Sequence, residues 1–209
     1  MKQQTFFDLI EKLQSNLQKK LPREKAHQIM EALSAEYLTL KPTEKTRKSA
    51  VLMLLYPIND EIYFPLILRN SYDGFHSNEI GFPGGRFEET DENLIQTALR
   101  EAKEEIGIEP DEVKILGTIT KIYIGPSDFS VLPVVGYLPH RPNFKPDSRE
   151  VQQIFDLKLD YFSDSNNLGF GEINIPGDMV TTPYYKVEGH KVWGATAKII
   201  VELLSVLKL

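Results

Sequence analysis

The sequence predicts a mixed α/β domain in which helices pack on a sheet. Three observations support this class: short apolar runs of strand length, longer segments with helical periodicity, and the order strands, helix, strands, helix along the chain. The chain has 209 residues, of which 41% are hydrophobic and 26% are charged, so it can build one substantial core. We therefore expect one domain that carries an additional segment.

Two helices are expected before the sheet, at 5–20 and 22–39. Apolar residues recur at helical spacing in the first, and Pro22 stands where the second helix would begin. A polar stretch follows, so residues 1–45 are predicted to form an N-terminal helical extension and residues 46–209 the main domain. The extension would cap a sheet edge, form a dimer contact or shape a pocket, and the sequence does not choose among these roles.

Strand candidates begin directly after the extension. The apolar run 50–56 is short enough for a buried strand, and 62–69 follows it after a turn. Pro65 lacks the amide hydrogen of a strand ladder, so it predicts an edge or a bulge in the second strand. The remaining strand candidates are 113–120, 130–138 and 152–159.

Two further helices are predicted, at 92–106 and 194–208. Each has apolar residues on one face, which indicates packing against the sheet. Gly107 stands where the first of them would end, because glycine adopts the left-handed conformation of a helix C-terminus at little cost.

Three acidic residues gather on one face of the predicted helix 92–106. Glu101, Glu104 and Glu105 fall within an arc of about 100°, next to the apolar face. Like charges at this spacing repel one another, and their position near the helix C-terminus is unfavourable for the helix dipole. A hard cation such as Mg²⁺ would convert this repulsion into shared coordination, with Arg100 fixing a carboxylate. A solvated acidic face with an ordinary Arg/Glu pair is the alternative.

A glycine turn precedes this helix. Gly84 and Gly85 can bring bare backbone close to a ligand or offer a carbonyl oxygen to a metal. A plain connecting loop is the alternative for these two residues alone. The turn, the amphipathic helix and the acidic triplet together are far more specific than any one of them.

Composition excludes several classes of protein. With 24 basic and 30 acidic residues the net charge is −6, which argues against a broad nucleic-acid-binding surface. The absence of cysteine excludes disulfides, thiolate zinc sites and thiol nucleophiles. The first twenty residues contain no long apolar run, so we expect no membrane span and a cytoplasmic protein.

The glycine turn and acidic helix together resemble the Nudix box. "REAKEEIGI" (100–108) matches the second half of that pattern at every fixed position. The first half departs from it: after Gly85 and five intervening residues comes Asp91, not glutamate, and eight residues rather than seven then separate Asp91 from Arg100. Leaving seven residues before the arginine gives Glu92 instead. The segment is therefore one residue longer than the Nudix pattern, and the role of its first acid is open.

The insertion resembles the coenzyme A pyrophosphatase branch of the Nudix hydrolases. "FPGGRFEETD" (82–91) is similar to that branch, with Glu88 where aspartate is more usual. "LILRNSYDGFHSNEIGFPGG" (66–85) is similar to the branch's signature, with Asn78 in place of glycine. Downstream similarity in order and spacing extends over "FSVLPVVGYLP" (129–139), "EVQQIFDLKLDYF" (150–162) and "VWGATAKIIVELL" (192–204). The resemblance covers about residues 46–207 and leaves the N-terminal helices outside.

The resemblance implies a Nudix α/β/α sandwich with a mixed sheet. It also implies hydrolysis of coenzyme A or its thioesters at the diphosphate, giving 3′,5′-ADP and 4′-phosphopantetheine. Glu101, Glu104 and Glu105 would bind Mg²⁺ or Mn²⁺, with the carbonyl of Gly85 as a further ligand. Glu104 is the preferred general base, and Arg100 would orient the acids.

Substrate contacts are expected from Arg69, Arg86, Gly84 and Gly85. A structural ion pair is the alternative for Arg69, and solvent exposure is the alternative for Arg86. His76 would be a surface-loop histidine, or a contact to phosphate or metal. Two roles are open for Tyr184, Tyr185 and His190: they would pack in the interior as aromatic strand residues, or they would line a nucleotide pocket.

Two rival functions remain at this point. The first is a Nudix hydrolase for ADP-ribose, a dinucleotide polyphosphate or another nucleotide conjugate, because the box encodes diphosphate chemistry and says little about the rest of the substrate. The second is a non-catalytic nucleotide-binding module, against which the intact acidic triplet argues. In each case the expected partner is a small nucleotide, without nucleic acid or membrane, and the protein would be a monomer or a homodimer.

Overall fold

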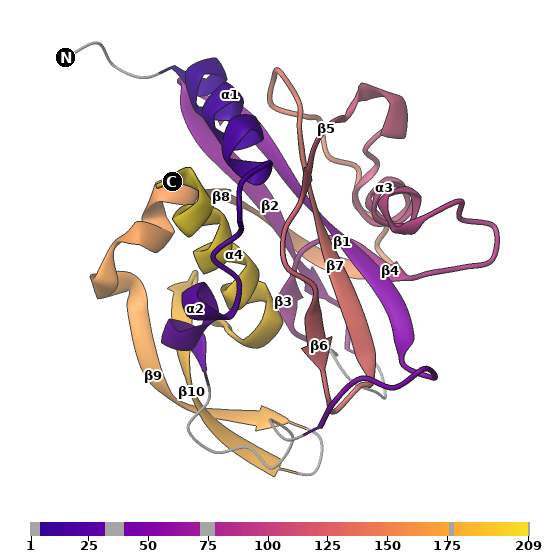
Figure 1. Cartoon of the computed structure of the whole chain (residues 1–209), viewed down its shortest axis with the longest axis vertical. Coiled ribbons are helices and arrows are strands. Elements are labelled where there is room, and N and C mark those ends of the chain that lie inside the picture. Colours follow the sequence, from indigo (N-terminus) through magenta and orange to yellow (C-terminus); the bar gives the residue numbers. More distant parts are fainter. Residues whose placement is uncertain (1–4, 32–39, 72–77, 176–177, 209) are drawn as a thin grey trace.

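The computed structural model describes residues 5–31, 40–71, 78–175 and 178–208 (Figure 1). Its helices are α1 (Phe6–Leu17), α2 (Glu24–His27), α3 (Leu94–Ile106) and α4 (Gly194–Leu207), with short 3-10 helices η1 (Gln28–Met30), η3 (Pro110–Glu112), η4 (Leu159–Ser163) and η5 (Ser165–Asn167). Its strands are β1 (Arg47–Ile58), β2 (Glu61–Arg69), β3 (Ile80–Gly81), β4 (Gly84–Arg86), β5 (Lys114–Thr118), β6 (Ile122–Ile124), β7 (Phe129–Tyr137), β8 (Val151–Lys158), β9 (Leu168–Ile175), β10 (Asp178–Val187) and β11 (His190–Val192).

The larger sheet is mixed, as the sequence predicts. Its strand order is β3-β2-β1-β7-β5, with β4 beside β1, β6 beside β7 and β8 beside β2. Strands β1 and β7 are parallel, whereas the other pairs in this sheet are antiparallel. Pro65 pairs with Asp156 of β8, and in the described chain it has no partner on its other side, because β1 pairs with β2 only as far as Tyr63. The expected local edge is therefore present.

Strand β1 supplies side chains to both faces of this sheet. Leu52 and Leu54 join the cluster under α3, whereas Met53 and Leu55 join the cluster under α1 and α4. Successive side chains of a strand point to opposite faces, so a strand buried on both sides reads as a continuous apolar run. Figure 1 shows α3 on one side of the sheet and α1 and α4 on the other, which is an α/β/α arrangement.

A second sheet, β11-β10-β9, was not predicted from the sequence. Gly169 and Gly171 lie in β9, and Pro183 lies in β10. Glycine and proline are depleted in strands, so these segments read as loops in the sequence. Tyr185 of β10 packs edge-on against Phe162, with ring centroids 4.8 Å apart, and tertiary packing of this kind overrides the local preference.

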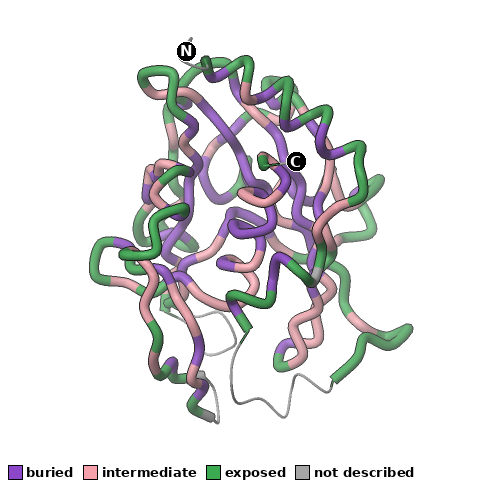
Figure 2. Tube along the Cα trace, turned by 60° about the vertical axis from the view of Figure 1, so that its left-hand side comes forward, coloured by how far each residue is buried: buried purple, intermediate pink, exposed green. Residues whose placement is uncertain are grey.

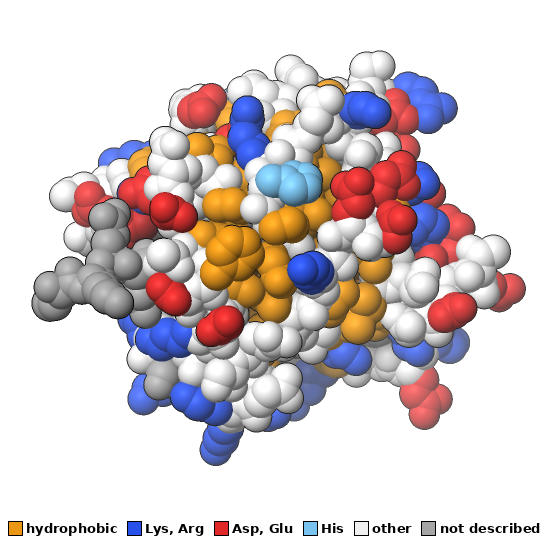
Figure 3. All heavy atoms as spheres, turned by 90° about the horizontal axis from the view of Figure 1, so that it is seen from above, with side chains coloured by type: hydrophobic (Ala, Val, Ile, Leu, Met, Phe, Trp, Pro, Cys, Tyr) orange, Lys and Arg blue, Asp and Glu red, His pale blue; other side chains and the backbone are white. Residues whose placement is uncertain are grey.

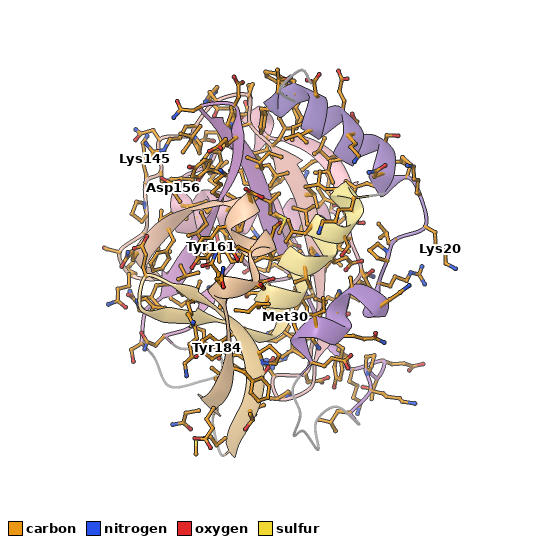
Figure 4. The ribbon with its side chains drawn as sticks, turned by 90° about the vertical axis from the view of Figure 1, so that its left-hand side faces the viewer. Lys20, Met30, Lys145, Asp156, Tyr161 and Tyr184 are labelled. Atoms are coloured by element: carbon orange, nitrogen blue, oxygen red, sulfur yellow. The ribbon has the colours of Figure 1, made fainter. Side chains whose placement is uncertain are left out.

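Helix α1 confirms the first predicted helix, with Thr5 as its N-cap in a reciprocal capping box with Asp8. The second prediction is only partly confirmed: in the described part of the chain α2 ends at His27, η1 follows, and Glu31 is extended with φ −80° and ψ 133°. Met30 is 1% exposed and lies beside α4 (Figure 4). Burial of its side chain holds the backbone here in a conformation that ends the helix, although helix propensity alone would let the helix continue. Residues 32–39 of that prediction lie outside the described residues.

The surface agrees with the charge balance of the chain. Figure 2 shows buried segments running through the interior, with exposed residues in the connections and on the outer sides of helices. On the face drawn in Figure 3, both acidic and basic side chains surround an apolar area. Within the described residues, no helix combines the length and apolar composition that a membrane crossing requires.

Candidate active site

Helix α3 presents its acids from a firmly defined position. Asn93 caps its N-terminus by accepting hydrogen bonds from the amides of Ile95 (2.9 Å) and Gln96 (3.1 Å). Gly107 ends it in the left-handed conformation, with φ 72°, as predicted. Its apolar face is buried under the sheet, which leaves the acids at the rim of the same helix.

Arg100 holds two of these acids with one guanidinium group. Its Nη1 atom donates to Glu101 (2.9 Å) and Glu104 (3.1 Å). Its Nη2 atom donates to the carbonyl oxygen of Arg86 at 3.0 Å, which ties the helix to β4. The guanidinium is planar and its donors are fixed relative to one another, so these contacts define the directions of both carboxylates.

Asp91 anchors the other side of this guanidinium. Its carboxylate accepts from Nε (2.9 Å) and Nη2 (3.1 Å) of Arg100 and from the hydroxyl of Thr97 (2.9 Å). Asp91 is buried, and its hydrogen bonds with Arg100 lower its pKa to about 2. The sequence left open the role of the acid at this departure from the Nudix box; in the structure it positions Arg100.

Replacing Asp91 by Asn is expected to lower the free energy of unfolding by about 2 kcal/mol at neutral pH, since it weakens hydrogen bonds to a charged group. The folded-state pKa lies below the unfolded value of about 3.9, so the contribution is full above that value and disappears as the pH falls through about 2. Denaturant unfolding of both proteins between pH 7 and pH 2 measures the difference.

The control for this measurement is Asp160→Asn. The Asp160 side chain is 77% exposed and lies 3.9 Å from Lys158, so its removal should change stability little at any pH. A gap between wild type and Asp91→Asn that stays constant down to pH 2 would contradict the assigned pKa.

Glu105 points in a different direction from its two neighbours. Its side chain is 1% exposed, and its Oε1 atom accepts from Nη1 of Arg69 at 2.5 Å. Its Oε2 atom accepts from the amide of Gly84 at 2.8 Å. Burial raises the pKa of Glu105, and the Arg69 guanidinium opposes that shift. In this arrangement Glu105 and Arg69 fasten the glycine turn to α3 and β2.

The two glycines are required for different reasons. Gly84 has φ 153°, and a Cβ there would lie 2.3 Å from the carbonyl oxygen of Ala50 in the paired strand β1. A Cβ on Gly85 would lie 2.4 Å from the Glu101 carboxyl carbon. Strand β4 therefore touches the carboxylate of Glu101 directly, with no side chain between them.

The matched substitutions Gly84→Ala and Gly85→Ala should separate folding from activity. Gly84→Ala collides with backbone and adopts a strained φ, so we expect a loss of roughly 2–4 kcal/mol in the free energy of unfolding. Gly85→Ala displaces the Glu101 carboxylate rather than backbone, so we expect a smaller loss of stability than for Gly84→Ala and a strong loss of hydrolytic activity. Thermal unfolding and turnover of both variants are the measurements, and a fully active Gly85→Ala protein would contradict the contact's importance.

A cavity of about 390 Å³ adjoins the glycine turn. Arg69, Gly84, Gly85 and Arg86 line it on the side of the turn. Much of the remaining wall is apolar and comes from β6, β7, β10, α4 and η1, including Ile122, Val131, Val180, Ile199 and Met30. A mostly apolar pocket with a few convergent polar groups is typical of a small-molecule site.

Four of the predicted site residues, Arg69, Gly84, Gly85 and Arg86, line this cavity, whereas Arg100 and the three acids of α3 lie beside the glycine turn and are not among the lining residues. Arg69 is partly buried in its pair with Glu105, yet it still lines the cavity, and Arg86 is exposed at the same end. Tyr184, Tyr185 and His190 are not among the described residues that line it, and Tyr185 packs in the core instead. His76 lies outside the described residues.

The donor set suits a hard divalent cation in its chemistry. Carboxylates and a backbone carbonyl are the oxygen ligands that Mg²⁺ and Mn²⁺ prefer. Burial raises the pKa of Glu101 to about 7, although the Arg100 guanidinium opposes this shift, and the neighbouring Glu105 and Glu104 add to it. A bound cation would therefore favour the ionised form of Glu101. Among the described residues, however, no three acidic, histidine or cysteine side chains are already grouped around one point. Glu101 and Glu104, beside Gly85, fit best, and Glu105 would have to leave its present partners.

Known proteins resemble this chain over much of its length. The NUDIX domain family matches residues 46–165, more than half of the chain. The chain is 39% identical over 127 residues to the uncharacterized Nudix hydrolase NudL of Pectobacterium atrosepticum, covering 58% of this chain and 62% of that protein. It is 31% identical over 173 residues to the human mitochondrial coenzyme A diphosphatase NUDT8, covering 81% of this chain and 73% of that one. The chain thus spans less than two thirds of the length of the bacterial relative.

A solved structure supports the fold. The chain matches the crystal structure of a MutT/nudix family protein from Enterococcus faecalis with a TM-score of 0.53 and 16% identity, over 90% of this chain and 74% of that one. At this identity the likeness concerns the fold alone. With the match of the family over residues 46–165, the acidic helix and the α/β/α arrangement lead to one conclusion: the chain belongs to the NUDIX domain family.

Proposed function

We propose that the protein hydrolyses the diphosphate bond of coenzyme A or its derivatives with the help of Mg²⁺ or Mn²⁺, giving 3′,5′-ADP and 4′-phosphopantetheine or its acyl form. The observation that carries this proposal is the contact of the α3 acids Glu101 and Glu105 with a double-glycine turn whose residues line a cavity. The human relative's name, coenzyme A diphosphatase, supports the choice of substrate.

Nudix hydrolases generally use divalent metal ions. In this proposal Glu101, Glu104 and Glu105 hold the ion, with the carbonyl of Gly85 as a further ligand. The ion would neutralise the diphosphate and stabilise charge on the leaving oxygen. Glu105 would exchange its contacts with Arg69 and Gly84 for this role.

Glu104 is the preferred general base. Its side chain is 56% exposed, and Arg100 holds it at 3.1 Å, so it is oriented and accessible to water. In the reaction a water oxygen forms a bond to one phosphorus and its proton passes to Glu104. The bond from that phosphorus to the bridging oxygen breaks, so one phosphate monoester leaves with the bridging oxygen and the other keeps the oxygen of the water. Arg100 holds the carboxylates of Glu101 and Glu104 in position during this step by donating a hydrogen bond to each.

The substrate is positioned from the other side of the turn. Gly84 and Gly85 let the backbone approach the diphosphate closely, and Arg86 adds a positive charge at the cavity's edge. Arg69 lines the cavity and would contact the substrate once Glu105 has exchanged its contact with Arg69 for the cation.

A substrate panel tests the proposal. Values of kcat/KM for coenzyme A, ADP-ribose, NADH and diadenosine polyphosphates are compared with and without Mg²⁺ or Mn²⁺. Coenzyme A should be the best substrate, with cleavage at the diphosphate and loss of activity in chelator. Preference for another nucleotide conjugate would refute coenzyme A as the substrate. If no member of the panel is hydrolysed, with or without the cation, the protein would instead be a nucleotide-binding module.

We further propose that residues 1–45 form an N-terminal extension and residues 46–209 the hydrolase domain, in a cytoplasmic protein. The match of the family from residue 46 supports this division. Cell fractionation would test the compartment, and the mass in solution would show whether the chain is a monomer or a homodimer.

A further inference from the structure

The cavity has a charge opposite to that of the whole chain. Among the described residues that line it, the charged ones are Arg69, Arg86, Lys198 and Glu79, whereas the chain has a net charge of −6. The two arginines reach the cavity from β2 and β4, beside the glycine turn. Lys198 reaches it from α4, together with apolar residues of that helix and of η1. The positive charges are therefore distributed over two separate parts of the wall.

Lys198 occupies an unusual position for a lysine. It is half-buried, and the apolar cavity wall around it includes Met30 and Ile199. Desolvation lowers its pKa, an effect that the charge of Glu31 partly offsets. Within the described residues no carboxylate lies close enough to Lys198 to form an ion pair, whereas Arg69 is paired with Glu105 at 2.5 Å. A partly desolvated ammonium group without a close counterion would gain most from an anionic ligand.

The fold holds Lys198 in place relative to the glycine turn. The hydroxyl of Thr196 in the first turn of α4 donates to the carbonyl oxygen of Ile80 in β3 at 3.3 Å. Strand β3 leads through Phe82 and Pro83 directly into Gly84. The start of α4 and the diphosphate end of the cavity are thus joined through a few residues, and both line one continuous space.

We propose that Lys198 binds a phosphate monoester of the substrate that is separate from the scissile diphosphate. This inference rests on the proposed function, in which Arg86 and a cation at the α3 acids already neutralise the diphosphate. Lys198 remains available for a second anionic group, and its ammonium can donate charge-assisted hydrogen bonds to phosphate oxygens. The ligand class is a nucleotide that carries an additional phosphomonoester, as coenzyme A does at its 3′ position. Lys198 would then distinguish such nucleotides from those without it.

Binding of two product-like nucleotides tests this role without requiring turnover. Dissociation constants for 3′,5′-ADP and 5′-AMP are measured by calorimetry with wild type, Lys198→Met and Lys198→Arg. Wild type should bind 3′,5′-ADP at least about 10-fold more tightly than 5′-AMP, the size of one charge-assisted hydrogen bond. Lys198→Met should lose this preference while binding 5′-AMP as before, and Lys198→Arg should keep most of it. Methionine retains the length of the apolar stem, so the fold should be preserved.

Lys121→Met is the matched control, because Lys121 is exposed and precedes β6 without lining the cavity. It should keep the wild-type ratio. Equal affinity of wild type for the two nucleotides, or an unchanged ratio in Lys198→Met, overturns the assignment. Hydrolysis of coenzyme A is measured separately: a wild-type protein that prefers 3′,5′-ADP through Lys198 but does not cleave coenzyme A would refute the proposed function and leave the phosphate subsite standing.

Discussion

Glu104→Gln is expected to lower kcat for coenzyme A by about 10²–10⁴-fold, the usual contribution of a general base. The amide keeps the size of the side chain but accepts no proton at neutral pH and binds a hard cation more weakly. The side chain is 56% exposed and its ion pair with Arg100 is near the surface, so the melting temperature should hardly change. Steady-state kinetics and thermal unfolding on the same preparation measure both quantities.

Glu109→Gln is the control for that substitution. The Glu109 side chain is 53% exposed and pairs with Lys103 at 2.7 Å, so it matches Glu104 in residue type, exposure and ion pairing. It lies beyond Gly107 and outside the acidic triplet, and its kcat should equal that of wild type. A Glu104→Gln protein with near wild-type turnover would remove this residue from the mechanism.

A truncation that begins at Lys45 is expected to abolish cooperative folding. It deletes Phe6, Ile10, Leu13 and Met30, which are 0–3% exposed and belong to the main core cluster. Burial of each such side chain contributes roughly 1.5–3 kcal/mol, and together they approach the whole stability of a typical domain, about 5–15 kcal/mol. Circular dichroism and thermal unfolding should show no sharp transition in the truncated chain.

Two neighbouring phenylalanines give a milder version of the same test. Phe6 is 0% exposed, whereas Phe7 is 51% exposed. Phe6→Ala should lower the free energy of unfolding by about 3–5 kcal/mol, and Phe7→Ala by less than about 1 kcal/mol. A truncated protein that melts like the full-length chain would show that the described part of the extension is dispensable for the core.

The sequence predicted the parts of this fold in which local pattern and tertiary structure agree. Helix α3 has a complete apolar face, an asparagine at its N-cap and Gly107 at its end, so its limits were readable within two residues. Strand β1 is buried on both faces, and its continuous apolar run identified it. The acids and the glycine turn were found together because their spacing along the chain is short.

The remaining features depend on contacts between distant segments. The strands β9 and β10 contain glycine and proline and are stabilised by pairing with each other, which no local pattern records. The second predicted helix gave way to η1 because Met30 is buried in the core. Lys198 has no sequence signal of its own, because its environment is made by segments far from it in the chain.

The direction of each acid also required the structure. Helical geometry placed Glu101, Glu104 and Glu105 on one arc, but their actual partners are set by Asp91, which fixes Arg100, and by Arg69, which turns Glu105 inward. Asp91 was visible in the sequence only as a departure from the Nudix box. Its role as an anchor follows from its hydrogen bonds with Arg100 and Thr97.

The most direct measurement of the proposed chemistry is a crystal structure with Mn²⁺ and a coenzyme A product, with anomalous scattering used to locate the ion. The expected result is an anomalous peak within ligand distance of the Glu101 and Glu104 carboxylates and the Gly85 carbonyl, with Glu105 turned from Arg69 toward the ion. A protein that hydrolyses coenzyme A in the same buffer while its crystals show Mn²⁺ elsewhere, and Glu105 still bonded to Arg69 and Gly84, would contradict the assignment of these acids as metal ligands.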